Sequence, residues 1–200
     1  MKMKNNIKVL CVTGPIGSGK STVADFFGKT YGIPIYYADH EAKKAYFDIL
    51  IKPQIEALLG KEVYRDGLPD YKLIGEKVFP RPTILKKLEN LIHPFVYEDF
   101  KNWLKRQCMP YVILENALLP ASEFKFFCDE TIVMQLPQEE QINRIVKRDG
   151  LSRKAILDRL ARQTGLDYRS INARWYLENL QSFKKLIPIL HEIHRFMVKK

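Results

Sequence analysis

Several features that would direct a protein to a membrane, a metal or an oxidising compartment are missing from this chain. Its 200 residues contain three cysteines, with no CxxC pair and no histidine at metal-ligand spacing, which argues against a disulfide framework and favours a reduced, cytosolic setting. No run approaches the roughly 20 apolar residues of a membrane span. The basic and then apolar start resembles a signal peptide, but its apolar run of about six residues is shorter than the usual hydrophobic region.

Repeats, low-complexity tracts and long Gly/Ser linkers are also lacking, so we expect one compact unit with insertions. What the chain does have is basic charge. Lys and Arg number 33 against 23 Asp and Glu, giving a net charge of +10. This balance favours anionic partners, namely nucleotides, nucleic acid or an acidic membrane, and charge alone does not choose among them.

Short apolar segments alternate with amphipathic ones along the chain. Four segments rich in β-branched residues predict buried parallel strands: 7–12, 33–38, 111–114 and 131–136. Helical spacing of apolar and charged residues marks the segments 21–30, 40–60, 83–107, 138–148, 152–163 and 181–197. Pro188 interrupts the last of these. The alternation predicts an α/β fold with a parallel sheet, and the helical block 40–107, too long for a simple crossover, predicts an inserted subdomain.

The stretch VTGPIGSGKS at 12–21 carries the most specific motif. It matches GxxxxGK[ST], the phosphate-binding loop, at Gly14, Gly19, Lys20 and Ser21. Glycine tolerates the dihedrals that turn successive N–H groups toward a phosphate. Lys20 can then reach the β and γ phosphates, and Ser21 can ligate Mg²⁺. Because a predicted strand precedes the motif and a predicted helix follows it, we favour nucleotide binding over a plain glycine turn with a solvated lysine.

Asp39 follows the second predicted strand, within YYADHEAKK. The carboxyl ends of parallel strands face the same crevice, so we expect this carboxylate near the γ-phosphate. There it could accept a proton from an attacking hydroxyl or hold magnesium through water. A helix N-cap explains the same residue equally well.

Basic residues gather in the segment 141–163, as Arg144, Lys147, Arg148, Arg153, Lys154, Arg159 and Arg162. Arginines four apart lie on one helical face and can converge on phosphate. A solvated charged helix is the usual alternative. The excess of basic residues favours a mobile lid that clamps phosphates.

Taken in order, these motifs resemble those of the dephospho-CoA kinase family over nearly the whole chain. TGPIGSGKST resembles the family's TGGIGSGKST, YADHEAK its DADxxxR, and LENLIHPFV its LExxxHPxV. VYRDGLPDYKLIGEKVF resembles the segment with DGxLDR and VF, and YVILENALL stands where the family has the strand leading to PLL. QLPQEEQINRIVKRDGLS resembles the QxxRxxxRD segment of the family's lid, and YLENLQS its VIxNxGS.

The resemblance implies transfer of the ATP γ-phosphoryl group, with Mg²⁺, to the ribose 3′-hydroxyl of dephospho-CoA, giving coenzyme A and ADP in the last step of coenzyme A biosynthesis. It also implies a P-loop kinase fold in three layers. The single kinase-like domain would comprise a core (1–38, 108–136 and 164–200), a helical acceptor-binding subdomain (39–107) and a helical lid (137–163). No nucleic-acid or membrane partner is expected, and the oligomeric state stays open.

The resemblance also assigns roles to residues. Asp39 would be the general base, with Lys20 and Arg144 as the other catalytic residues. Asp39, Lys43 and His93 would bind the acceptor, although a histidine before proline at a helix start is often only structural. Ser21 would hold Mg²⁺. The ATP-binding set would be Gly14, Ile16, Gly17, Ser18, Gly19, Lys20, Ser21, Thr22, Arg144, Arg148 and Asn179.

The chain departs from the family pattern at several positions: Tyr37 for the first Asp, Lys43 for Arg, Tyr71 for the Arg of DGxLDR, Glu115 and Ala117 before PLL, and Gln181 for the glycine of NxGS. The changes at 43 and 71 put the acceptor's anion contacts in doubt, because lysine lacks the guanidinium fork and tyrosine carries no charge.

Two other functions stay open. One is a different small P-loop kinase acting on a nucleoside or nucleotide. The other is a P-loop ATPase that binds RNA, which is disfavoured because aromatic residues do not interleave with the basic ones.

Overall fold

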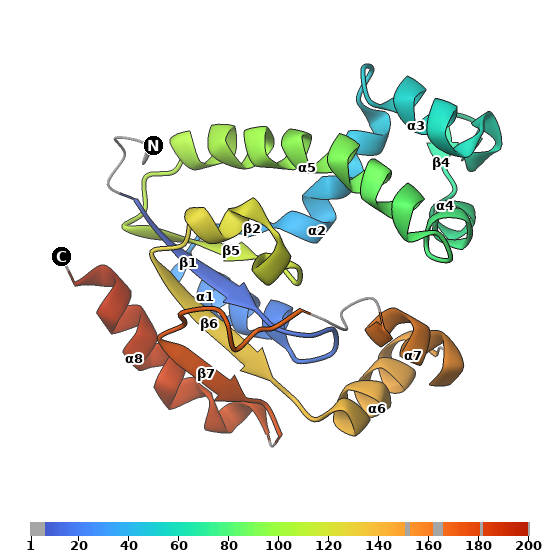
Figure 1. The fold of residues 1–200 in the computed structure, drawn as a ribbon. Coiled ribbons are helices and arrows are strands. Elements are labelled where there is room, and N and C mark those ends of the chain that lie inside the picture. The colour runs from blue at the N-terminus through green and yellow to red at the C-terminus, as the bar shows by residue number, and fades with distance from the viewer. Residues whose placement is uncertain (1–6, 151–152, 162–165, 181, 200) are drawn as a thin grey trace. The chain divides into compact units, whose positions relative to one another are not determined.

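The structure is a computed structural model, and it describes residues 7–150, 153–161, 166–180 and 182–199 (Figure 1). Its internal contacts divide the chain into two compact units. Unit 1 comprises Met1–Tyr37 and Gln107–Lys200, and unit 2 comprises Ala38–Arg106. Within the described ranges, no helix combines the length and apolar character needed to cross a bilayer.

Unit 1 is built on a five-stranded sheet in the order β2-β5-β1-β6-β7, in which every pairing is parallel. The strands are β1 (Lys8–Thr13), β2 (Ile35–Tyr37), β5 (Tyr111–Glu115), β6 (Glu130–Gln135) and β7 (Trp175–Glu178). Four of them lie where the sequence predicts strands. The fifth, β7, was not predicted, because this short edge strand carries exposed Tyr176 and Glu178 beside buried Leu177 and so lacks a continuous apolar run.

Helices follow or connect these strands (Figure 1). The α-helices of unit 1 are α1 (Lys20–Tyr31), α6 (Gln138–Asp149), α7 (Arg153–Ala161) and α8 (Ile187–Val198), and its 3₁₀ helices are Leu119–Ala121, Glu123–Phe126 and Phe183–Lys185. Pro188 lies in the first turn of α8, where a missing N–H costs nothing, so the predicted interruption of a longer helix is wrong.

The core of unit 1 forms where one face of the sheet packs against α1 and α8. Alternate residues of β1, Leu10 and Val12, join the same buried cluster as Phe27 of α1 and Leu190 of α8. This period of two is what a strand with one face on a helical layer requires. Each of these side chains is fully buried, so the direction of β1, and of the loop that follows it, is fixed by packing.

Unit 2 contains a two-stranded hairpin, β3 (Tyr64–Arg65) and β4 (Leu68–Pro69), whose tight turn carries Asp66 and Gly67, both with positive φ. Its helices are α2 (Ala38–Glu41), a 3₁₀ helix (Ala42–Phe47), α3 (Lys52–Leu59), a 3₁₀ helix (Lys61–Val63), α4 (Tyr71–Val78) and α5 (Pro82–Lys105). The helix predicted over 40–60 is therefore broken. Asp48 divides it, because its carboxylate accepts from the N–H groups of Leu50 and Ile51 and turns the chain.

Helix α5 runs through the His93–Pro94 pair, in agreement with the helix predicted over 83–107, so His93 lies within a helix and not at a helix start. Proline inside a helix removes one backbone hydrogen bond. A buried apolar stripe at four-residue spacing holds the helix together across that gap: Leu88, Ile92, Val96, Phe100 and Leu104.

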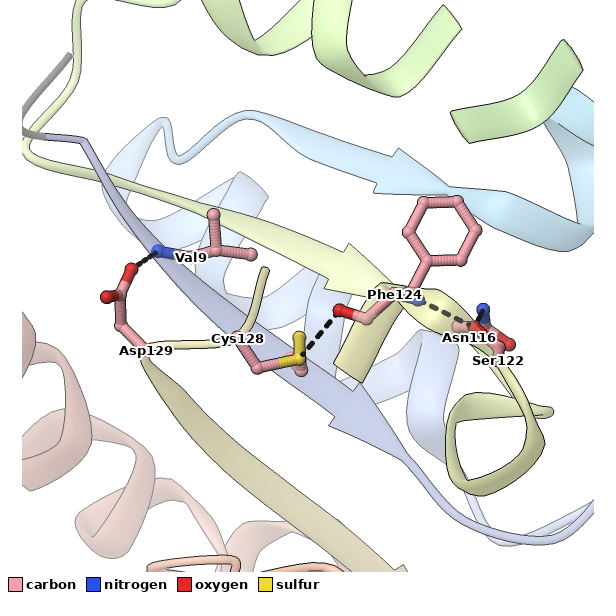
Figure 2. The surroundings of a disulfide bond; sticks show 7 residues. Val9, Asn116, Ser122, Phe124, Cys128 and Asp129 are labelled. Atoms are coloured by element: carbon pink, nitrogen blue, oxygen red, sulfur yellow. Dashed lines mark hydrogen bonds between the residues drawn. A yellow bond between two sulfur atoms is a disulfide. The ribbon is translucent and has the colours of Figure 1, made fainter. Parts of the chain in front are cut away.

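A disulfide bond joins Cys11 of β1 to Cys128, which precedes β6, with Cα atoms 5.6 Å apart. Figure 2 shows the segment around Cys128, where the Asp129 carboxylate accepts from the Val9 N–H at 2.9 Å. The expectation that all three cysteines are reduced is wrong for this pair. The two cysteines are 117 positions apart, and only the pairing of β1 with β6 brings them together.

Alkylation tests the cysteine assignment. Because Cys108 is free and exposed, iodoacetamide should modify one cysteine of the denatured, unreduced chain and three after reduction. Intact-mass spectrometry counts the adducts. The control variant Cys108→Ser should take up none before reduction and two after it, and three adducts on the unreduced wild-type chain would contradict the bond.

Candidate functional site

The loop between β1 and α1 contains three glycines with positive φ, and at Gly14 and Gly19 a side chain would come too close to neighbouring atoms. Gly14, Gly17 and Gly19 have φ values of 139°, 80° and 97°, which favour glycine. A Cβ at Gly14 would lie 2.3 Å from the carbonyl oxygen of Met134 in β6, and one at Gly19 would lie 2.3 Å from Nδ2 of Asn179. Helix α1 begins directly after Gly19, whose lack of a side chain leaves the first N–H groups open to an anion.

The other loop residues are divided between packing and polar roles. Ile16 packs against the buried cluster of Ile142, Ile145 and Ile156 from α6 and α7. The buried hydroxyl oxygens of Thr13 and Ser18 have no hydrogen-bond partner among the described groups. Buried hydroxyls are usually satisfied, so these two point to a polar ligand at the loop. Ser21 and Thr22 are exposed in the first turn of α1.

Lys20 is held inside the loop by contacts with the protein itself. Its side chain is 9% exposed, and its ammonium group donates to the carbonyl of Pro15 at 3.2 Å. Oε1 of Glu115, the buried last residue of β5, lies 3.9 Å from the same nitrogen. In the parallel register Glu115 faces Val12 of β1 and Tyr37 of β2, so its carboxylate occupies the strand-end position beside the phosphate loop.

Glu115 is a candidate site residue that the sequence marks only as a departure from the family pattern. The available signal was an acidic residue just past the predicted strand 111–114. In an open parallel sheet the residues at that end of a strand face the ligand crevice. An acidic residue at that position is therefore a candidate for the ligand site even where it departs from the family motif.

Arg144 and Asn179 both lie at the loop. Nδ2 of Asn179 donates to the carbonyl oxygen of Ser18 at 3.0 Å, and Nη2 of Arg144 donates to the carbonyl oxygen of Asn179. Arg148 does not join them. Its guanidinium makes two hydrogen bonds to Asp149, at 2.7 and 3.0 Å, which raise the pKa of the arginine further.

The rest of the basic segment is occupied elsewhere or lies outside the described residues. Nη2 of Arg153 bonds to both carboxylate oxygens of Glu139, at 2.8 and 2.9 Å. Lys147 and Lys154 are exposed. The side chain of Arg159 and the whole of Arg162 and Gln181 fall outside the described residues. The clamping role of this segment stays a prediction.

The predicted acceptor residues all belong to unit 2. Asp39 is exposed and lies inside the short helix α2, which begins at Ala38, so it is not the N-cap that the alternative explanation required. Lys43 is exposed, with its ammonium nitrogen 5.7 Å from the centre of the Tyr71 ring. These are two of the positions that depart from the family pattern, and they contact each other. Half-buried His93 lies on α5, with its ring centre 6.2 Å from that of Tyr97.

Tyr37, the third departure, ends β2 two residues before Asp39. Its hydroxyl donates to the carboxylate of Asp25 on α1. Burial, this hydrogen bond and the negative charges of Asp25 and Glu115 all raise the pKa of the tyrosine well above its usual value. Position 37 therefore carries a neutral group tied to α1 where the family pattern has a carboxylate.

The polar groups fit a magnesium ion that arrives with a nucleotide, rather than a metal site made by protein alone. No cluster of three or more His, Cys, Asp or Glu suited to a metal occurs among the described residues. Mg²⁺ typically uses one or two protein oxygens together with phosphates and water. Ser21 and Glu115 offer oxygens of that kind, and the unpartnered hydroxyl of Ser18 shows that the loop has capacity for a further polar ligand.

Comparison with known proteins decides the family. The model of a family described as dephospho-CoA kinase matches residues 8–185. The chain belongs to the dephospho-CoA kinase family. A dephospho-CoA kinase of Bacteroides fragilis is 31% identical over 191 residues, which cover 94% of this chain and 92% of that protein.

Solved structures share the fold of this chain. The crystal structure of TT1252 from Thermus thermophilus, 31% identical, matches with a TM-score of 0.82 over 96% of this chain and 98% of that one. A dephospho-CoA kinase from Campylobacter jejuni shares the fold, with a TM-score of 0.61 at 23% identity over 96% and 98% of the two chains. The predicted P-loop kinase fold is confirmed. The family model and the curated relatives support dephospho-CoA kinase activity, an ATP-dependent phosphoryl transfer.

Replacing Lys20 tests the phosphate loop. Lys20→Ala removes the buried ammonium group, and we expect both weaker ATP binding and a turnover lower by about 100- to 1,000-fold, as when one preorganised donor is lost. The matched control is Lys29→Ala, which removes an exposed lysine from the same helix. Steady-state kinetics and ATP titration of both variants give the comparison. Equal effects of the two substitutions would contradict the role of Lys20.

Proposed function

We propose that this chain transfers the γ-phosphoryl group of ATP to the ribose 3′-hydroxyl of dephospho-CoA, giving coenzyme A and ADP. The observation that carries the proposal is the glycine loop at 14–19 with Lys20 buried in it, since a buried ammonium group beside a glycine loop at a helix N-terminus suits a chain of phosphates. The identity of the acceptor is supported by the family and its relatives.

On the donor side, the loop and the N-terminus of α1 bind the phosphates through backbone N–H groups. Lys20 exchanges its contact with the carbonyl of Pro15 for a phosphate oxygen. Glu115 balances the charge of Lys20 before the nucleotide binds, because a buried ammonium without a counter-charge is costly. The pair thus keeps the Lys20 ammonium group at the loop.

Magnesium would be held by the Ser21 hydroxyl and the phosphates. The Glu115 carboxylate, which lies beside Lys20, would offer a further oxygen. When bound, the ion supplies charge stabilisation to the phosphoryl group in transfer. Arg144 and Arg148 add positive charge from α6 and help to exclude water, for which Arg148 must exchange Asp149 for a phosphate.

On the acceptor side, we propose that Asp39 is the general base for the 3′-hydroxyl, with Lys43 and His93 as binding residues in unit 2. Asp39 is exposed to solvent, and a carboxylate within reach of a hydroxyl can accept its proton. Lys43 already lies against Tyr71, so its contact with a substrate anion competes with a cation–π contact.

We expect a cytoplasmic location, where the bond between Cys11 and Cys128 would be uncommon because cytosolic reductants keep thiols reduced.

An ADP-release assay with dephospho-CoA, nucleosides and RNA in parallel tests the acceptor. We expect turnover with dephospho-CoA alone. Turnover that depends on a nucleoside or on RNA instead would overturn the proposal in favour of another small kinase or an RNA-dependent ATPase.

The role of Asp39 is tested by Asp39→Asn, which keeps the shape of the side chain and removes the base. General-base catalysis typically contributes about 100- to 10,000-fold, so kcat should fall within that range while the Kd for ATP stays within about twofold. His40→Asn, on the exposed neighbour, is the control and should leave both constants unchanged. A kcat close to that of the wild type would show that Asp39 is not the base.

A further inference from the structure

Hydrogen bonds within the protein hold both the backbone and the side chain of Asn179. It is the first residue after β7, and its N–H donates to the carbonyl of Gln135 on β6 at 3.1 Å, which extends the strand pairing by one step. The residue is 7% exposed. Its backbone and its burial together aim the side chain at the phosphate loop, where Nδ2 donates to the carbonyl oxygen of Ser18 at 3.0 Å.

The position of that hydrogen bond matters because the Ser18 carbonyl and the Gly19 N–H belong to one peptide group. The peptide is trans, so its C=O and N–H point in opposite directions. Binding the oxygen on the Asn179 side therefore turns the Gly19 N–H to the other side. Gly19 has a φ of 97°, a conformation that favours glycine, and glycine restricts the orientation of its own peptide less than other residues do. A hydrogen bond to the Ser18 carbonyl therefore helps to hold one orientation.

A side chain at position 19 would displace the amide of Asn179. A Cβ there would lie 2.3 Å from Nδ2, so the amide would have to move away from the Ser18 carbonyl oxygen. Glycine at this position therefore suits the dihedral angle and leaves room for the contact. Arg144 adds a second restraint by donating to the backbone carbonyl of Asn179 itself, so α6 is attached to the same residue.

We propose that Asn179 is a positioning residue for phosphate binding: by holding the Ser18 carbonyl, it presents the Gly19 N–H to the phosphates of the nucleotide. This inference rests on the proposed function of the loop, and it assigns the effect of Asn179 to the phosphate end of ATP, through Gly19, rather than to the base. The Arg144 contact makes the α6 helix part of the same arrangement.

The two ends of ATP can be tested separately, with tripolyphosphate as a probe that has no base and adenosine as a probe that has no phosphate. For Asn179→Ala, we expect tripolyphosphate and ATP binding to weaken by about tenfold, the range of one lost hydrogen bond to a charged ligand, and adenosine binding to change by less than about twofold. Glu178→Gln, at the exposed end of the same strand, is the matched control and should leave all three affinities unchanged. Ligand-observed NMR and calorimetry give the affinities.

A second measurement uses the wild-type chain, so it does not depend on the folding of the variant. In ¹⁵N-labelled protein, the amide resonance of Gly19 should be among those that shift on addition of tripolyphosphate.

Three outcomes would overturn the inference while leaving the kinase function intact: equal weakening of adenosine and tripolyphosphate, unchanged binding of both to Asn179→Ala, or a Gly19 amide that does not respond. If the wild-type chain binds neither ATP nor tripolyphosphate, the proposed function fails as well.

Discussion

Strand β1 holds the centre of the sheet, and the site depends on that position. It is hydrogen-bonded to β5 on one side and β6 on the other, and Leu10 and Val12 are buried against α1 and α8. A strand fixed along both edges ends at a defined point. The glycine loop starts there, so its peptide groups are placed by a rigid frame even though glycine is the most flexible residue.

The neighbours of β1 supply the groups that the loop itself lacks. β5 ends in Glu115, which sets a negative charge beside Lys20, and β6 approaches so closely at Met134 that only glycine fits at position 14. β7 pairs with the other edge of β6 and places Asn179 beside the loop, where its amide donates to the carbonyl oxygen of Ser18. The ends of three parallel strands thus place a carboxylate, a close backbone contact and a side-chain amide around one loop.

The sequence alone predicted the features that depend on residues close together in the chain. The phosphate loop is one contiguous motif, and four of the five strands are continuous apolar runs, so period and composition suffice for them. The contacts of Lys20 with Glu115 and of Asn179 with Ser18 are different, because they join segments brought together only by the order of strands in the sheet. The bond between Cys11 and Cys128 was missed for the same reason. In unit 2, the break at Asp48 was not predicted, because a side-chain hydrogen bond overrides the helical spacing there. The helix past Pro94 was predicted, because its apolar spacing continues on both sides of the proline.

The bond between Cys11 and Cys128 has a topological consequence for the chain. It closes a covalent ring that runs from Cys11 to Cys128. The whole phosphate loop and every residue of unit 2 lie inside this ring. A protease that cuts once inside unit 2 would therefore open the ring without separating the pieces, and the mass of the nicked chain would rise only by that of one water molecule. Only reduction would let the two fragments part.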